Sequence, residues 1–370
     1  MLEVKPIILS GMPTSIFPIW DALHEKSFSP NFQQNFEYIS SWVRNLRGNW
    51  RPLLIFVKKR NRVLGILPLM FRNEKRRNVL PYRRVTFLAS ERTDFNIVLA
   101  DPKDVEEVTT AGLDWLCSGA LRWELLILDD LVEGNPIISA VPKWAERSHV
   151  VLNQKIGKYY YINLRRPWDD IWGETSKKFI RKNINVARNR LNRTGSWQIL
   201  VNPCWETKEI VDHAIRISLL RGFSAGISPT RREAYKKFLT DVIEINRRKG
   251  IFNSYWMILN ETVIAYEFIF EQRDVCYAWT GTFNPEYASY WPSRLLLLEI
   301  MKRYHEKRFK EFSFMRGEAE YKAKWTPNFK KNYRFIIKNK DNIYGKMIIS
   351  AEKLSQLLNW KYFSTPSIKR

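Results

Sequence analysis

The chain has 370 residues, of which 45% are hydrophobic and 14% aromatic, so it can bury a substantial core and is too long for one ordinary domain. This composition excludes wholesale disorder, and no run of about 18 apolar residues predicts a transmembrane segment. The N-terminal apolar run is too short for a secretory signal. The three cysteines are far apart, and no histidines are spaced as metal ligands, so we expect no metal site and a reducing, cytoplasmic location.

Basic residues dominate the charge of the chain. Sixty-one Lys and Arg residues outnumber 38 Asp and Glu, giving a formal net charge of +23. Such a charge attracts nucleic acid, an anionic membrane surface or a ligand that carries phosphate. Lysine-rich composition also occurs in heat-adapted proteins, which is the alternative interpretation.

The first half predicts helices followed by a sheet. Residues 1–50 are aromatic-rich and predict mostly helix, and residues 53–71 predict a hairpin because two apolar runs flank the polar turn KKRNR. Two strand-like stretches, RRVTFLAS and DFNIVLA, come before a helix, and WELLILDDL after the helix predicts a buried strand. The predicted buried face of that helix comprises Val105, Val108, Leu113 and Leu116.

The second half repeats this order. Residues 253–272 predict another hairpin, followed by the strand VCYAWTGTFNP, the helix SRLLLLEIMKRYHEK and the strand KEFSFMRG. Val63-Leu64-Gly65 aligns with Val263-Ile264-Ala265, which favours a duplicated α/β unit over a chance resemblance. We therefore predict domains at 1–150 and 151–337 and a helical tail at 338–370.

A basic helix is predicted over residues 175–195, with Thr175 or Ser176 as its cap and Gly195 at its end. Its buried face at helical spacing comprises Ile180, Ile184, Ala187 and Leu191. Seven cations lie between Lys177 and Arg193, with no acidic residue among them. They form either a solvated face or a contact for a polyanion, such as tRNA or an anionic membrane surface.

Three places in the chain are candidates for chemistry. Glu267 lies in the apolar strand AYEFIF, where it either faces solvent or is buried with a raised pKa suited to a general base. Asp94, in ERTDFN, either orients a substrate amine or hydroxyl or caps a turn. Pro292, Ser293 and Arg294 begin a helix whose amides are able to hold a phosphate, or they form an ordinary helix start.

The segment FSFMRGEAEYKAKW completes a recognisable order of elements. Together with the basic helix, the hairpin and the PSRLL helix start, it resembles the GNAT acyltransferase superfamily. The CelD/BcsL-type branch, named for cellulose biosynthesis, is the most similar; it is related to the FemABX peptidyltransferases, which carry two GNAT-like domains. The most specific piece is G-x-x-x-Y-K-x-x-W, filled by Gly317, Tyr321, Lys322 and Trp325. The resemblance covers about residues 150–335 and extends to the first half only as a fold pattern.

This resemblance implies an α/β fold of two tandem GNAT-like domains, each a mixed, mostly antiparallel sheet flanked by helices. It implies that Tyr321 and Trp325 wall an acyl-donor cleft and that Lys322 and Arg316 meet phosphate or the charge of a tetrahedral intermediate. The implied catalytic residues are Glu267, Tyr321 and Lys322. The implied donor-binding residues are Trp279, Pro292, Ser293, Arg294 and Arg316. The implied acceptor-binding residues are Asp94 and Trp325.

Two positions depart from the pattern of the branch. Ser293 stands where the branch commonly has Gly after Pro292, so backbone approach to a phosphate is less free. Ser313 stands where the branch commonly has Asp in the strand before Arg316-Gly317.

The function implied by the resemblance is transfer of an acyl group, acetyl in the first instance, from acyl-CoA to an amine or hydroxyl. The acceptor would be a small molecule or a saccharide, such as a sugar or polysaccharide precursor. The alternatives are a FemABX-like peptidyltransferase that depends on aminoacyl-tRNA, and an inactive GNAT-like scaffold in an envelope polysaccharide system.

Overall fold

The computed structural model describes residues 2–76, 80–222, 229–341 and 347. It divides into two compact units. Unit 1 comprises the described residues of Met1–Pro30, Arg47–Ile156 and Tyr333–Arg370, and unit 2 those of Asn31–Leu46 and Gly157–Asn332. The predicted tail helix, in MIISAEKLSQLL, lies outside the described residues apart from Met347.

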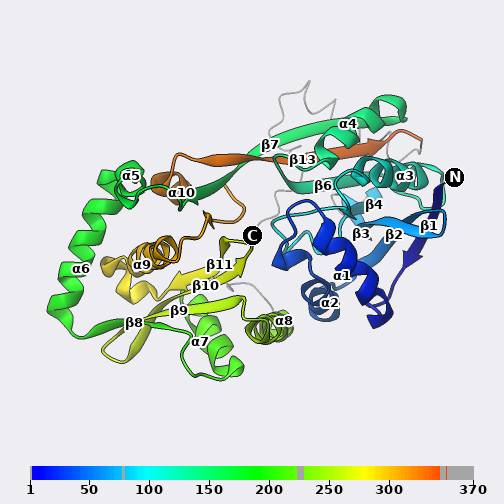
Figure 1. Cartoon of the computed structure of the whole chain (residues 1–370). Coiled ribbons are helices and arrows are strands. Elements are labelled where there is room, and N and C mark those ends of the chain that lie inside the picture. The colour runs from blue at the N-terminus through cyan, green and yellow to red at the C-terminus, as the bar shows by residue number, and fades with distance from the viewer. Residues whose placement is uncertain (1, 77–79, 223–228, 342–346, 348–370) are drawn as a thin grey trace. The chain divides into compact units, whose positions relative to one another are not determined.

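Unit 1 contains a mixed, mostly antiparallel sheet (Figure 1). Its strands, in hydrogen-bonding order, are β1 (Leu2–Ile8), β2 (Arg51–Lys59), β3 (Arg62–Arg76), β4 (Leu80–Phe87), β6 (Leu125–Val132), the second part of β13 (Phe329–Asn339) and the first part of β7 (Val150–Asn163), while β5 (Leu99–Ala100) pairs with β3. Its helices are α1 (Phe17–Lys26), α3 (Val105–Cys117) and α4 (Ile137–Arg147). Helix α3 packs on β1, β2 and β3, and the main core of the unit lies between this sheet and helices α3 and α4.

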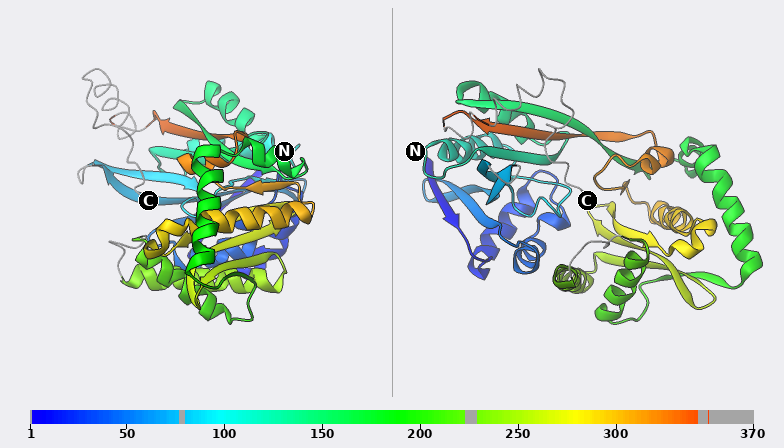
Figure 2. Two further views of the ribbon diagram at one scale, coloured as in Figure 1. Left: turned by 90° about the vertical axis from the view of Figure 1, so that its left-hand side faces the viewer. Right: turned by 180° about the vertical axis from the view of Figure 1, so that it is seen from behind.

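Unit 2 has a sheet of the same kind. Its strands, in hydrogen-bonding order, are the second part of β7 (Val150–Asn163), β12 (Glu311–Ser313), β11 (Val275–Phe283), β10 (Thr262–Gln272), β9 (Phe252–Leu259) and β8 (Trp197–Val201). Its helices are α2 (Phe36–Asn45), α5 (Trp168–Glu174), α6 (Lys182–Thr194), α7 (Thr207–Leu220), α8 (Pro229–Arg248), α9 (Pro292–Glu306) and α10 (Glu320–Trp325). Helix α9 covers one face of β9, β10 and β11, and α7 and α8 lie on the other (Figure 1). Helix α6 lies across α9 (Figure 2).

The two hairpins share unusual details. Each turn consists of two residues with positive φ, Arg60-Asn61 in unit 1 and Asn260-Glu261 in unit 2. In the second strand of each hairpin, one residue, Leu64 or Ile264, has no partner in the first strand and forms a β-bulge. In both units the strand after the hairpin pairs in parallel with the strand after the helix, β4 with β6 and β11 with β12. The predicted fold class of two similar α/β units, each a mixed sheet flanked by helices, is confirmed.

Several predicted elements are confirmed. The four predicted core residues of α3 are buried, and so are the four of the basic helix. The basic helix begins with a π-helical turn, Lys177–Arg181, where the Ser176 hydroxyl accepts a hydrogen bond from the Phe179 amide. Helix α6 ends at Thr194, and Gly195 is its C-cap.

One predicted region is partly wrong. Residues 1–50 were predicted to be mostly helical, yet Leu2–Ile8 is a strand that pairs with β2. Partly buried and exposed residues largely alternate along this strand, which is the pattern of an edge strand with one face on the core.

Two long strands run from one unit into the other. Strand β7 passes from unit 1 to unit 2 after Ile156, and β13 passes from unit 2 to unit 1 after Asn332. The domain boundaries proposed from the sequence, near residues 150 and 337, fall within these strands. Each of these two strands therefore has one part in unit 1 and its other part in unit 2.

A short N-terminal segment also belongs to unit 2. The ring of Phe32 stacks on Phe270 of β10 with centroids 3.8 Å apart. The Asp241 carboxylate accepts hydrogen bonds from Ser41 at 3.0 Å and Asn45 at 2.9 Å. These contacts hold residues 31–46 against α8 and the sheet.

No helix in the described part of the chain is both long enough and apolar enough to cross a membrane.

The Phe32 contact generates a stability prediction. Replacing Phe32 with Ala removes a fully buried ring, so we expect the free energy of unfolding to fall by about 3–5 kcal/mol. Urea denaturation measures this loss. Leu220→Ala, at a site that is 53% exposed, is the control and is expected to change stability by less than about 0.5 kcal/mol. Equal losses in the two variants would show that residues 31–46 are not anchored by Phe32.

Candidate active site

The pairing between two neighbouring strands of unit 2 stops before the end of the longer strand. Strands β11 and β12 are paired in parallel through three residue pairs, the last of which joins Tyr277 and Ser313. Strand β11 continues beyond this pair to Phe283, whereas β12 ends at Ser313. Beyond Tyr277, the edge of β11 is therefore no longer paired with β12.

The chain turns sharply where β12 ends. Met315 and Gly317 have φ values of 58° and 104°, and the second of these lies in a region that favours glycine. The Lys322 ammonium donates hydrogen bonds to the carbonyl oxygens of Met315 at 3.1 Å and Arg316 at 2.6 Å. Lys322 is only 5% exposed, so α10 holds a positive charge in the interior and fixes the turn around it.

Glu267 lies on β10 directly opposite Gly281 of β11. A Cβ atom on Gly281 would overlap the Glu267 Oε2 atom, so the carboxylate occupies space that any other residue at position 281 would fill. Glu267 is 8% exposed, which is the buried alternative that the sequence left open.

The environment of Glu267 raises the pKa of its carboxyl group from 4.5 to about 8. Burial is the main cause because it disfavours the charged form, and the positive charge of Lys322 opposes it in part. Within the described residues, no hydrogen bond to this carboxyl group occurs. The group is therefore uncommitted and titrates near neutral pH, as a general base must.

Tyr321 and Trp325 take different positions on α10. Trp325 is 1% exposed and belongs to the core beneath α9, together with Phe314. Tyr321 is 41% exposed, but burial and then the Glu267 charge raise the pKa of its hydroxyl group. Glu267, Tyr321 and Lys322 are thus electrostatically coupled, and we call these three residues the Glu267 cluster.

Backbone hydrogen bonds already engage part of the first turn of α9. Pro292 occupies the first turn, and the amides of Arg294 and Leu295 both donate to the Trp291 carbonyl, at 3.0 and 3.1 Å. Ser293 carries a buried hydroxyl group with no hydrogen-bond partner within the described residues. The Arg294 amide, one of those from which the sequence predicted phosphate binding, is therefore already engaged.

Arg294 is likewise engaged. Its guanidinium lies 3.7 Å from the centre of the Trp291 ring and donates to the Phe179 carbonyl at 2.8 Å. Burial lowers the pKa of this guanidinium. These contacts join the start of α9 to the π-helical turn before α6.

Trp279 lies on the other face of the sheet from Glu267. It is the extra residue of a β-bulge in β11, and its ring contacts Phe32, Phe238 and Phe270. Because residues alternate between faces along β10, Phe270 and Glu267 point in opposite directions. The structure does not bring Trp279 together with the Glu267 cluster, and its predicted part in donor binding stays a prediction.

The other predicted site residues are partly buried. Asp94 belongs to unit 1, in the loop between β4 and β5, and Arg316 lies in the turn held by Lys322. Their predicted roles, in acceptor and donor binding respectively, stay predictions.

Sequence reasoning missed Gly281. Counted back from the Arg273-Asp274 turn, an unbroken hairpin would place Thr280 opposite Glu267. The bulge at Trp279 shifts the register by one residue and brings Gly281 there instead. The sequence pattern that pointed to this pairing was a Glu in an apolar strand followed by a glycine in the next strand.

The pKa of Glu267 predicts a pH-dependent effect on stability. The folded-state value lies above the unfolded one, so the wild-type protein loses stability as pH rises from about 4.5 to about 8. Glu267→Gln cannot ionise there. Urea denaturation should therefore show the variant gaining more than about 1 kcal/mol relative to wild type between pH 5 and pH 8.

Glu261→Gln is the matched control, because Glu261 is exposed on the turn of the same hairpin. It should follow the wild-type pH dependence. Parallel curves for wild type and Glu267→Gln would mean that Glu267 is not held in a desolvated site.

Comparisons with known proteins give a family match for this part of the chain. The family model described as acetyltransferase (GNAT) domain matches residues 178–323, which include the whole Glu267 cluster. No curated protein matched the chain.

Solved structures show a similar fold over nearly the full length. FemX has a TM-score of 0.57 at 11% identity, covering 96% of this chain and 99% of its own. A conserved protein of unknown function from Bacteroides thetaiotaomicron VPI-5482 has a TM-score of 0.56 at 11% identity, with coverages of 91% and 100%. L-PGS from Bacillus licheniformis has a TM-score of 0.51 at 11% identity, with coverages of 90% and 95%. The chain therefore has a FemX-like fold, and residues 178–323, within unit 2, are similar to the acetyltransferase (GNAT) domain model.

Proposed function

We propose that unit 2 transfers an acyl group from an acyl-CoA thioester, acetyl-CoA in the first instance, to an amine or hydroxyl acceptor. The observation that carries this proposal is the Glu267 carboxyl group. It is buried, it has a pKa of about 8 and it receives no hydrogen bond from the described residues. It lies beside a buried lysine in a GNAT domain, on the strand that pairs with the open stretch of β11.

Glu267 acts as the base in this mechanism. Its ionised carboxylate takes a proton from the acceptor N–H or O–H, directly or through one water molecule. The acceptor then adds to the thioester carbonyl carbon, and the carbonyl oxygen becomes an oxyanion. Positioning of the two substrates and stabilisation of this oxyanion supply most of the rate in such a step.

Lys322 and Tyr321 act on the charges that develop. The ammonium of Lys322 provides a fixed positive field for the oxyanion. When the intermediate collapses, the C–S bond breaks and the thiolate leaves. The Tyr321 hydroxyl group, which its raised pKa keeps protonated, donates a hydrogen bond to this thiolate. The proton held by Glu267 then passes to sulfur, which restores the base.

The acceptor in this proposal is a small molecule or saccharide precursor in the cytoplasm, as the resemblance to the CelD/BcsL-type branch implies.

A second candidate is transfer from aminoacyl-tRNA. The observation that favours it is the basic surface of the π-helical turn and α6. Of its seven cations, Arg188 pairs with Glu299 at 2.6 Å, and the other six have no carboxylate within ion-pair distance among the described residues. Such a surface would bind a polyanion with strong salt dependence.

An inactive scaffold is the third candidate, favoured by Ser313 and by the engaged Arg294 amide at the start of α9. Calorimetry with acyl-CoA separates it from the first, because an inactive scaffold without a donor site would not bind the thioester.

The role of Glu267 predicts a kinetic effect. Glu267→Gln should lower kcat by about 100-fold to 10,000-fold and change the donor KM by less than about twofold, because the base acts in the transition state. The wild-type kcat/KM should rise with pH through about 8 as the carboxyl group ionises. Release of free thiol, measured with acyl-CoA and a panel of amines and hydroxyl compounds, provides the assay.

Glu261→Gln serves again as the control and should retain wild-type kinetics. Unchanged turnover in Glu267→Gln would remove Glu267 from the mechanism. Transfer from charged tRNA but not from acyl-CoA would favour the second candidate, and neither transfer nor binding of acyl-CoA would favour the third.

Lys322 predicts a second kinetic effect. Lys322→Met should lower kcat and move the pH dependence of kcat/KM to higher pH, because the lysine charge lowers the pKa of Glu267. Lys322→Arg keeps the charge and should retain the wild-type pH dependence. Lys324→Met, on the same helix but paired with Glu320 at 2.7 Å, is the matched control. A loss of activity in Lys322→Met with no change in its pH profile would limit Lys322 to a structural role in the turn.

A further inference from the structure

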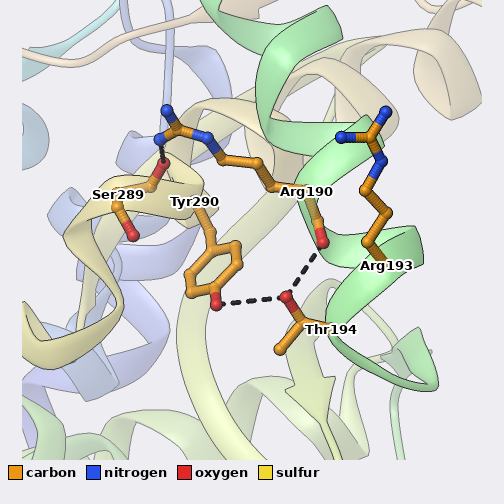
Figure 3. Close-up of a pocket in the computed structure, with 5 residues that line it drawn as sticks. All are labelled: Arg190, Arg193, Thr194, Ser289 and Tyr290. Carbon is orange, nitrogen blue, oxygen red and sulfur yellow. Dashed lines mark hydrogen bonds between the residues drawn. The ribbon is translucent and has the colours of Figure 1, made fainter.

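A small pocket opens beside the start of α9. Its volume is about 260 Å³, and it lies between α6 and the 3-10 helical segment Pro285–Tyr290, which joins β11 to α9. Figure 3 shows the residues that line it: Arg190, Arg193, Thr194, Ser289 and Tyr290. None of these residues belongs to the Glu267 cluster.

Two arginines give the pocket a positive charge. Arg190 and Arg193 are three residues apart and therefore lie on the same side of α6. Neither has a carboxylate within ion-pair distance in the described part of the chain, whereas Arg188 on the same helix pairs with Glu299. Like charges at this spacing cost about 0.2–0.5 kcal/mol, which a bound anion would offset.

The pocket is held in shape by its own hydrogen bonds. Arg190 Nη1 donates to the Ser289 carbonyl at 3.1 Å, so the guanidinium reaches across from α6 (Figure 3). The Thr194 hydroxyl donates its proton to the Arg190 carbonyl at 2.9 Å. It therefore acts as the acceptor for the Tyr290 hydroxyl, which lies 3.2 Å away. A guanidinium has five N–H donors, so Arg190 keeps several for a ligand after its bond to Ser289.

This arrangement suits phosphate. Guanidinium groups bind phosphate oxygens in pairs of parallel hydrogen bonds, and two of them line one wall here. The exposed Ser289 adds a hydroxyl group on the opposite side. A volume of about 260 Å³ holds a phosphate and part of the sugar that carries it, but not a large ligand.

The place of the pocket in the chain indicates which molecule supplies the phosphate. Strand β11 leads from Gly281, opposite Glu267, to Phe283 and then into the segment that carries Ser289 and Tyr290. A thioester whose acyl carbon lies at Glu267 and whose chain follows β11 would bring its nucleotide end to this segment. Pro292 has no N–H and the Arg294 amide is engaged, so side chains are needed to supply further donors to a phosphate.

We propose that Arg190 and Arg193 bind a phosphate group on the nucleotide portion of the acyl donor. This inference rests on the proposed function, because it takes the donor to be a CoA thioester. It assigns phosphate recognition to guanidinium side chains of α6, whereas the resemblance implied the start of α9, with Arg294, and Arg316.

The test compares two double variants that lose the same charge. Arg190→Ala/Arg193→Ala removes the pocket arginines. Lys208→Ala/Lys237→Ala removes two exposed lysines from α7 and α8, on the other face of the sheet. Calorimetry with adenosine 3′,5′-bisphosphate should show at least a tenfold loss of affinity in the arginine variant and less than a twofold loss in the lysine variant.

Kinetics give the second readout. The KM for acyl-CoA should rise at least tenfold in the arginine variant, while turnover with acyl-pantetheine, which lacks the nucleotide, should match the wild type. Equal effects in both double variants would overturn the proposal, because they would reflect only the general positive field. Bulk tRNA that displaces the bisphosphate, binds more tightly and depends on these arginines would also overturn it, by assigning them to an RNA backbone.

The phosphate site and the acyl-transfer function can be disproved independently of each other. Transfer from acyl-CoA with no change in the arginine variant overturns the pocket and leaves the proposed function standing. Arginine-dependent binding of the bisphosphate without transfer of any acyl group overturns the proposed function and leaves the phosphate site. Absence of bisphosphate binding to the wild-type protein overturns the pocket whether or not transfer occurs.

Discussion

The candidate site depends on the fit of the Glu267 carboxyl group into the space above Gly281. The bulge at Trp279 creates this fit by moving a residue without a side chain opposite the glutamate. Burial then raises the pKa of the carboxyl group, and Lys322 limits the rise. A single irregularity in one strand therefore decides whether an acidic residue in the sheet is an ordinary carboxylate or a group that exchanges protons near neutral pH.

The segment from Phe314 to Trp325 shows why two aromatic residues and two lysines lie so close together. Trp325 enters the core, and Lys322 turns inward to hold the Met315 and Arg316 carbonyls. Lys324 pairs with Glu320 within α10. The side chains of this short helix therefore have different roles. Trp325 fixes the helix to the core, and Lys322 stabilises the turn. The charge of Lys322 also lowers the pKa of Glu267.

Local patterns predicted much of this fold. Alternation and turn residues predicted both hairpins, and helical spacing predicted the buried faces of α3 and the basic helix. The sequence also singled out Glu267 and Lys322, although it left the burial of Glu267 open. It could not place Gly281, because a bulge changes register without a distinctive residue pattern. The pocket at Arg190 joins residues about one hundred positions apart, which local periodicity does not reveal.

The two crossing strands have a consequence for how the polypeptide acquires its structure. The sheet of unit 1 includes β13 beside β6, so its last partner is synthesised only after all of unit 2. During translation, the edge of β6 that pairs with β13 stays unpaired until β13 has been synthesised. Intermediates with such an unpaired strand edge are prone to mispairing. Pairings of such wide sequence separation also slow folding, since the entropy of closing the intervening loop is lost before the contacts form. Cutting the gene between its two repeats would leave the first product without β13 and the second without residues 31–46.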